Sequence, residues 1–117
     1  MMTRLKVKRI YDPYDQADGR RILVDRLWPR GIKKEEAQLD DWLKDIAPTP
    51  DLRKWFHEDK ERFETFSEKY QDELTDNEAV TTIIDALEEG DVSLIYAAKD
   101  KQRNHAVVLQ HFIEERR

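Results

Sequence analysis

The order of apolar and polar residues near the start of the chain predicts one half-exposed strand. Over residues 4–10 apolar and basic side chains alternate, so that one face of the strand would be apolar and the other would carry lysines. Residues 11–20 contain an Asp-Pro and an Asp-Gly pair, which are typical of turns. A loop is therefore expected to follow this strand.

Two later segments are apolar without alternation, which predicts strands covered on both faces. They are residues 21–28 and residues 92–98. Pro29 and Gly31 would end the first of them. Because helical patterns separate the two strands, a parallel pair with a right-handed crossover is favoured. The direction of the first strand stays open, since its short loop also suits an antiparallel neighbour.

Helical spacing of apolar residues accounts for most of the remaining chain. The predicted helices begin at Lys33 (with Leu39, Trp42, Leu43 and Ile46 on one face), at Pro50 after the N-cap Thr49, and at Phe63. Two more begin with the capping-box pattern of Thr75-Asp76-Asn77-Glu78 and after the N-cap Asn104. The predicted fold class is α/β, with a small, mainly parallel sheet of three to four strands flanked by about five helices.

Length and composition narrow the classes of protein that this chain can be. Its 117 residues fit a single α/β domain, residues 1–117. The chain has no cysteine, which excludes disulfides, thiolate metal sites and a cysteine nucleophile. No apolar run resembles a secretory signal or a membrane span, so a cytoplasmic location without membrane contact is expected. The net charge of −5 argues against general nucleic-acid binding.

Polar side chains gather where the two buried strands are predicted to end. In open parallel sheets, ligands bind beyond the carboxyl ends of the strands, and neighbouring parallel strands end at the same edge. The segments that follow both strands are therefore expected to share a crevice. Its candidate residues are Asp25, Arg26, Arg30, Tyr96, Lys99, Asp100, Asn104 and His105, with Arg53 reaching it from a helix.

This set of side chains suits the recognition of an anion. Arginine offers forked donors that match phosphate or carboxylate, which assigns ligand binding to Arg26, Arg30 and Arg53, with Lys99, Tyr96 and Asn104 as further contacts. The start of the last helix would add free N–H groups. The candidate catalytic residues are His105 as acid or base and Asp25 or Asp100 as its orienting carboxylate or as the base.

Each of these residues also has a structural interpretation. Asn104 could serve only as an N-cap, and Tyr96 could belong to the core. His57 is followed by two carboxylates, but adjacent helical residues do not converge on one ion, so no metal site is predicted. With three glycines and no phosphate-loop motif, the sequence identifies no cofactor.

Four motifs, in order along nearly the whole chain, resemble the YeaO-like branch of the domain-of-unknown-function family 488 (DUF488). They are Asp25-Arg26-Leu27-Trp28-Pro29-Arg30-Gly31, Trp42-Leu43-Lys44-Asp45-Ile46-Ala47-Pro48, Leu52-Arg53-Lys54-Trp55-Phe56-His57, and Leu94 to Asp100 followed by Asn104-His105-Ala106. The resemblance implies a bacterial or archaeal cytoplasmic α/β protein. Where the broader family often has Cys-His-Arg, this chain has Asn104-His105-Ala106, so a mechanism that needs that cysteine does not carry over.

Three hypotheses about function follow from the sequence. The leading one is a pocket that binds an anionic small molecule bearing phosphate or carboxylate, with enzymatic action on it left open. The second is a protein-interaction module that uses exposed aromatic residues between residues 33 and 74, and it predicts an apolar surface patch there. The third is a nucleic-acid accessory factor that uses Arg26, Arg30 and Arg53, with salt-dependent binding.

Overall fold

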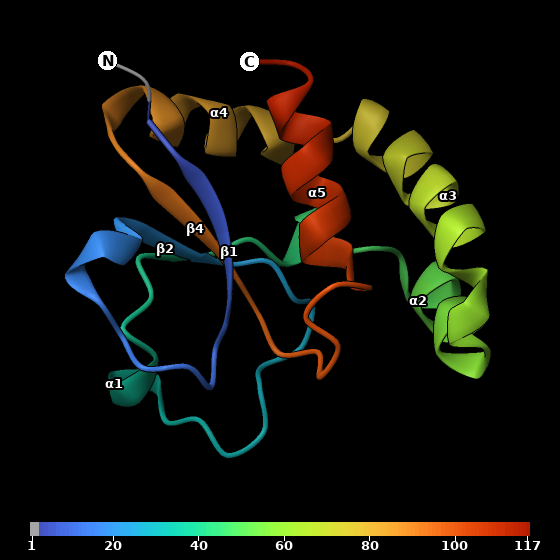
Figure 1. Ribbon diagram of the computed structural model, residues 1–117, viewed down its shortest axis with the longest axis horizontal. Coiled ribbons are helices and arrows are strands. Elements are labelled where there is room, and N and C mark those ends of the chain that lie inside the picture. The colour runs from blue at the N-terminus through green and yellow to red at the C-terminus, as the bar shows by residue number, and fades with distance from the viewer. Residues whose placement is uncertain (1–2) are drawn as a thin grey trace.

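A computed structural model describes residues 3–117 and contains one parallel four-stranded sheet (Figure 1). The strands are β1 (Leu5–Arg9), β2 (Arg20–Leu23), β3 (Asp41–Trp42) and β4 (Val92–Tyr96), in the sheet order β1-β4-β2-β3. The α-helices are α1 (Lys34–Ala37), α2 (Pro50–Glu58), α3 (Phe63–Thr75), α4 (Ala79–Glu89) and α5 (His105–Glu114). The predicted fold class, a small parallel sheet with about five helices, is confirmed.

The direction of the first strand, left open by the sequence, is parallel. β1 pairs with β4 from Leu5 opposite Val92 to Arg9 opposite Tyr96. β2 pairs with the other side of β4, also in parallel. Because β4 lies between β1 and β2, the loop between these two strands has to bring the chain back to the starting edge of the sheet, and no hairpin can form.

The two buried strands differ in length from the prediction. All five residues of β4 are buried, as the apolar run indicated. β2 ends at Leu23, and the predicted continuation to Trp28 is wrong: Leu27 is 63% exposed. The backbone N–H of Val24 still donates to the carbonyl of Ile95 (3.0 Å), after which the chain leaves the sheet.

The helix predicted from Lys33 to Ile46 does not exist as one element. α1 covers four residues and ends at Gln38, which has a positive φ of 47°. The chain then adds β3 to the sheet, where the backbone N–H of Leu43 donates to the carbonyl of Leu23 (2.9 Å). Leu39 and Trp42 pack on the sheet, and the ring of Trp42 meets that of Trp28 edge to face at 5.3 Å. The apolar residues whose spacing predicted a helix instead pack on the sheet from an irregular segment and a short strand.

The other helix boundaries follow local capping chemistry, with one exception. The Thr49 hydroxyl accepts a hydrogen bond from the backbone N–H of Leu52, as expected for the N-cap of α2. Gly90 ends α4 as expected. The predicted capping box before α4 is absent, because α3 runs on through Thr75, and the Asn77 side chain instead accepts a hydrogen bond from the N–H of Ala79.

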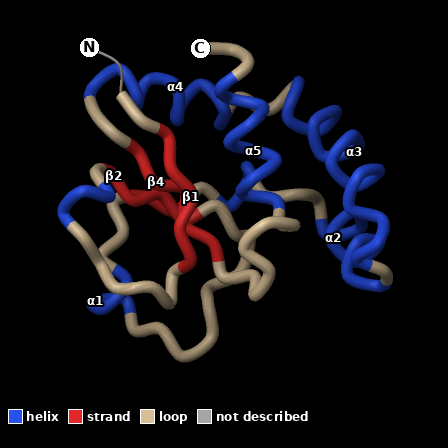
Figure 2. The backbone as a smooth tube through the Cα atoms, in the orientation of Figure 1, coloured by secondary structure: helices blue, strands red, loops and turns tan. Residues whose placement is uncertain are grey.

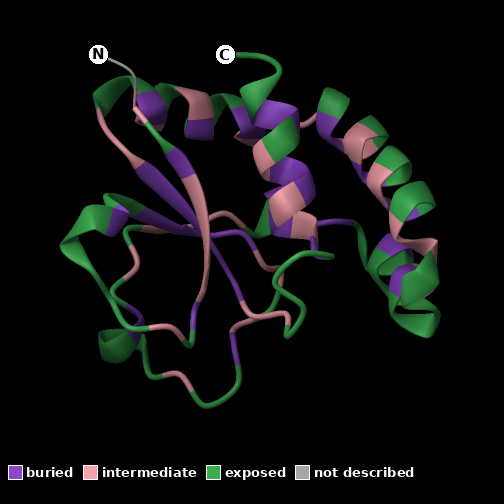
Figure 3. Ribbon diagram, viewed as in Figure 1, coloured by how far each residue is buried: buried purple, intermediate pink, exposed green. Residues whose placement is uncertain are grey.

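Two apolar layers of unequal size lie on the two faces of the sheet, and Figure 2 shows α5 and α1 on opposite sides of its strands. Alternate side chains of a strand point to opposite faces, so Ile22 and Leu94 face one layer while Leu23 and Ile95 face the other. The larger layer packs against the inner faces of α2, α3, α4 and α5, which are buried in Figure 3. The smaller layer is covered by α1 and by the long segment between β2 and β3. These two coverings leave the carboxyl ends of β2 and β4 facing an open pocket.

Candidate functional site

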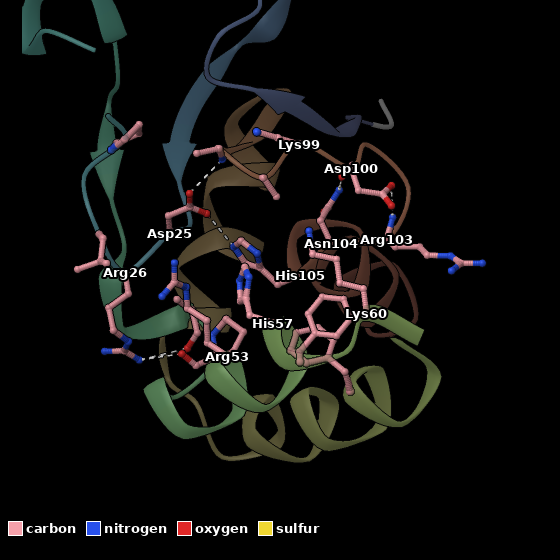
Figure 4. A pocket seen from close by; sticks show the side chains of 18 of the residues that line it. Asp25, Arg26, Arg53, His57, Lys60, Lys99, Asp100, Arg103, Asn104 and His105 are labelled. Atoms are coloured by element: carbon pink, nitrogen blue, oxygen red, sulfur yellow. Dashed lines mark hydrogen bonds and ion pairs between the residues drawn. The ribbon is translucent and has the colours of Figure 1, made fainter. Parts of the chain in front are cut away.

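A pocket of about 580 Å³ lies at the carboxyl ends of β2 and β4 (Figure 4). Its walls come from the segment after β2, from α2, from the loop after β4 and from the start of α5. Eight of the nine predicted site residues line it: Asp25, Arg26, Arg30, Arg53, Lys99, Asp100, Asn104 and His105. The expectation that parallel strands would bring these segments together agrees with the geometry.

His105 and Asp25 form a close pair in this pocket. The Nε2 atom of His105 lies 2.9 Å from Oδ1 of Asp25 and 3.1 Å from the carbonyl oxygen of Val24. Both neighbours can only accept hydrogen bonds when Asp25 is ionised, so Nε2 has to carry the hydrogen. A neutral His105 therefore keeps its lone pair on Nδ1. The imidazole is held by one nitrogen and can accept or donate a proton with the other.

Asp25 also holds the ends of the two central strands together. Its Oδ2 atom accepts a hydrogen bond from the backbone N–H of Ala97 (3.0 Å), just beyond β4. The side chains of Asp25 and His105 are each 16% exposed. Asp25 is thus fixed by backbone on one oxygen and faces the imidazole with the other.

Asp100, the alternative carboxylate partner for His105, has a different role. Its Oδ1 accepts hydrogen bonds from the backbone N–H groups of Arg103 and Gln102 (3.0 and 2.9 Å). These bonds lower the pKa of Asp100 and shape the loop that leads into α5. Of the two carboxylates proposed for His105, the structure pairs Asp25 with it and leaves Asp100 at the solvent-exposed rim.

Asn104 uses its whole side chain to hold the start of α5. Its Oδ1 accepts from the N–H of Val107 (2.9 Å), and its Nδ2 donates to the carbonyl of Asp100 (2.9 Å). The residue is 2% exposed. The capping interpretation of Asn104 accounts for both polar atoms, although the residue borders the pocket.

We therefore expect Asn104→Ala to act on stability more than on binding. Loss of the N-cap should lower the free energy of unfolding by about 1 kcal/mol, because an N–H of the first turn loses its acceptor. Urea unfolding followed by circular dichroism measures this change. A variant with unchanged stability would show that the cap is dispensable.

Tyr96 does not line the pocket. It is 2% exposed and packs within the larger apolar layer, so the core interpretation of this residue is the one the structure supports. Burial raises the pKa of its phenol. The sequence could not show that Tyr96 faces the core. In a strand covered on both faces, side chains on either face are buried, so their alternation does not distinguish the core side from the pocket side.

The predicted arginines are arranged unequally around the pocket. The Arg26 guanidinium donates from Nη2 to the carbonyls of Ala47 and Pro48 at 3.3 and 3.4 Å. Arg30 and Arg53 are exposed at its edge. Arg26 is thus hydrogen-bonded to the backbone, whereas the exposed side chains of Arg30 and Arg53 form no hydrogen bond or ion pair within the described part of the chain.

Sequence reasoning missed three basic residues of this pocket. His57, Lys60 and Arg103 also line it. His57 lies four residues after Arg53 on α2, a spacing that places both on one helix face, and this spacing was the available signal. Partial desolvation, together with the positive charges of Arg53, Lys60 and His105, lowers the pKa of His57.

The lining is strongly basic for a chain that is acidic overall. Six Lys and Arg side chains (Arg26, Arg30, Arg53, Lys60, Lys99, Arg103) and two carboxylates (Asp25, Asp100) surround it, whereas the whole chain carries a net charge of −5. The acidic residues are therefore concentrated elsewhere on the protein. The lining of the pocket therefore carries a local excess of positive charge.

Within residues 3–117, no group of three or more His, Asp or Glu side chains is placed to hold a metal ion. Over the same range, no helix is long and apolar enough to cross a bilayer.

Comparisons with known proteins place the chain in a family. A family model described as "Inactive DUF488-N3 subclade" matches residues 4–117. The uncharacterized protein YeaO of Escherichia coli is 46% identical over 110 residues, which cover 93% of this chain and 96% of YeaO. The uncharacterized protein Rv3073c of Mycobacterium tuberculosis is 40% identical over 114 residues, 97% of each chain. No solved structure matches. The predicted resemblance to the YeaO-like branch is thereby confirmed, and the chain belongs to the DUF488-N3i family, the inactive DUF488-N3 subclade.

Proposed function

We propose that this protein binds a small molecule bearing a phosphate or carboxylate group in the pocket at the ends of β2 and β4. The observation that carries the proposal is the excess of six basic over two acidic side chains around one cavity of an acidic chain. A volume of about 580 Å³ lies within the range of ordinary small-ligand sites. The proposal includes a cytoplasmic location, with which a chain lacking cysteine is compatible.

Basic residues on two sides of the pocket would bind the anionic group of the ligand. Arg53 and Lys60 offer charged donors from the α2 side, and Arg30, Lys99 and Arg103 do so from the two loops. Arginine can grip a planar carboxylate or a phosphate with two donors at once. Apolar side chains of Leu27 and Phe56 also line the pocket, so the ligand has room for an uncharged part beside its anionic group.

The proposed function is recognition of the ligand without turnover. The pair of His105 and Asp25 has the geometry of an oriented acid or base, which is the enzymatic alternative. The family description as an inactive subclade favours binding alone, as does the lack of a cysteine beside His105. His105 then serves as a polar contact of the pocket.

The other two hypotheses have less support. The interaction module required an apolar patch between residues 33 and 74, but the exposed large apolar side chains among the described residues are Tyr11, Tyr14 and Leu27. The nucleic-acid hypothesis required a basic surface from Arg26, Arg30 and Arg53. These arginines surround a pocket, and a flat or grooved basic surface is what a polymer would need.

Isothermal titration with sulfate, inorganic phosphate and citrate tests the proposal. We expect saturable binding of at least one of them, weakened at least about tenfold in the double variant Arg53→Ala, Lys60→Ala, because two charged hydrogen bonds are lost. Lys101→Ala is the matched control, since Lys101 is an exposed lysine near the pocket but outside its lining.

Two results would count against the proposal. If none of the three anions binds the parent protein, the pocket has no role as a general anion site. If Lys101→Ala weakens binding as much as the double variant, the anions bind through the overall charge of the protein and not in the pocket.

A further inference from the structure

We propose that the anionic group bound beside α2 is a dianionic tetrahedral oxyanion, of the phosphate-monoester class, and that its binding protonates His57. The inference rests on the proposed function and specifies its ligand class. Phosphate monoesters carry up to two negative charges near neutral pH and several strong acceptor oxygens. A carboxylate carries one charge and two oxygens.

Basic groups from three elements meet at this end of the pocket. Arg53 and His57 lie one helical turn apart on α2, Lys60 follows in the 3₁₀ turn Lys60–Arg62, and His105 begins α5. Figure 4 shows the imidazoles of His57 and His105 next to each other, with Asp25 on the far side of His105. Two imidazoles and two permanent cations therefore border the same space.

The groups facing His57 are all basic. Desolvation lowers the pKa of His57 most, and the positive charges of Arg53 from its own helix, Lys60 from the next turn and His105 from α5 lower it further. The surroundings of this imidazole in the free protein thus disfavour its protonated form. An anion placed among these groups reverses the sign of the local field, so that protonation of His57 becomes favourable.

His105 faces a different set of groups. On its Nε2 side are the Asp25 carboxylate and the Val24 carbonyl, and the ring of Tyr70 from α3 lies 6.3 Å away, edge to face. The Nε2 hydrogen of His105 is therefore directed at Asp25 and Val24, away from the ligand. The dianion is left to match His57, Arg53 and Lys60.

The number of charges is what favours a dianion over a carboxylate. A carboxylate bonded to Arg53 is already neutralised and leaves Lys60 and His57 without an anionic partner. A dianion leaves one charge that Lys60 and His57 can share. Proton uptake on binding means that affinity rises as the pH falls through the range in which His57 titrates.

Sulfate is a suitable probe, because it keeps two charges between pH 5.5 and pH 8.0. We expect its affinity for the parent protein to rise roughly 30-fold from pH 8.0 to pH 5.5, since an imidazolium facing an anion is worth about tenfold or more. Acetate, a monoanion over most of this range, should gain less than about threefold. Isothermal titration at four pH values measures both.

The three histidines of the chain supply the controls. His57→Gln should reduce the pH dependence for sulfate to about fivefold or less, because the linked proton is lost. His111→Gln should leave it unchanged, since His111 is an exposed residue on α5 outside the pocket. In a histidine NMR titration, saturating sulfate should raise the pKa of His57, and it should leave the ring resonances of His111 unchanged.

The possible outcomes separate this inference from the proposed function. Sulfate binding with a flat pH profile, or acetate binding more tightly than sulfate, would overturn the dianion assignment and leave the anion pocket standing. Binding of no anion at any of these pH values would overturn the proposed function itself. If His57→Gln and His111→Gln reduce the pH dependence of sulfate binding equally, the groups that take up protons lie outside the pocket.

Discussion

Replacing Asp18 by Asn is expected to lower the free energy of unfolding by about 3–5 kcal/mol, the usual cost of removing one partner from a buried ion pair. Asp18 is 6% exposed, and its Oδ2 lies 2.5 Å from Nη1 of Arg21, a residue 1% exposed. Lys8 approaches the same carboxylate at 3.0 Å. The variant leaves the Arg21 guanidinium buried without a counter-charge, so it should unfold at a much lower urea concentration.

The stability that Asp18→Asn is expected to lose depends on pH. Burial alone would raise the pKa of Asp18, but hydrogen bonds from Lys8, from the backbone N–H of Asp15 and from Arg21 outweigh it and lower the pKa below 3.8. A carboxyl group with a lowered folded-state pKa stabilises the protein above its ordinary pKa, and this stabilisation is lost as the pH falls through the lowered value. The difference between parent and variant should therefore be full at pH 7 and shrink below about pH 3.8.

Asp41→Asn is the matched control for Asp18→Asn. Asp41 also pairs with an arginine of β2, since its Oδ2 lies 2.6 Å from Nε of Arg20, but this pair is exposed to solvent. Exposed pairs are worth less than about 1 kcal/mol. Equal losses in the two variants would contradict the role assigned to the buried pair.

The position of the pocket was predictable because it depends on strand direction alone. Two apolar runs separated by helices favour parallel strands, and parallel strands end at one edge. Asp25 and His105 are 80 positions apart, yet Asp25 lies at the end of the first buried segment and His105 starts the helix that follows the second, and that is enough to expect them near each other. Their pairing at 2.9 Å needed coordinates, because Asp100 satisfied the same sequence argument.

Other parts were not predictable, for reasons that differ between residues. Leu39 and Trp42 fit a helical period, but the same spacing suits an irregular segment whose apolar side chains pack on a sheet face, and local sequence does not separate the two. Tyr96 is the last residue of β4, in which every position is buried, so the sequence alone does not tell whether its side chain faces the core or the pocket. His57 was not predicted to line the pocket. A histidine followed by two carboxylates suggests a metal ligand more readily than one of several basic residues around a pocket.

The buried ion pair of Asp18 and Arg21 and the proposed binding pocket lie at opposite ends of the sheet. The buried pair of Asp18 and Arg21 lies where β2 begins, whereas Asp25 and the pocket lie just beyond the end of β2. Variants at the first end should therefore change the free energy of unfolding and leave anion affinity of the folded protein unchanged. This separation allows binding and folding defects to be distinguished in the experiments proposed above.

The second large effect on stability is expected at Gly19, the residue immediately before β2. Gly19 has a φ of 68°, which favours glycine, and a Cβ atom added there would lie well inside contact distance of the backbone carbonyl of Asp91. That carbonyl cannot easily move away, because it accepts a hydrogen bond from the N–H of Arg20 at 2.9 Å. Gly19→Ala should lower the free energy of unfolding by about 3 kcal/mol, from backbone strain and overpacking together.

Gly31→Ala separates these two causes. Gly31 has a similar φ of 76°, but a Cβ atom added there would have nothing within 4 Å, so only the backbone strain remains. Its expected cost is about 1 kcal/mol. Urea unfolding of both variants gives the comparison. If Gly31→Ala costs as much as Gly19→Ala, backbone conformation alone explains the preference for glycine, and the close approach of Asp91 contributes nothing.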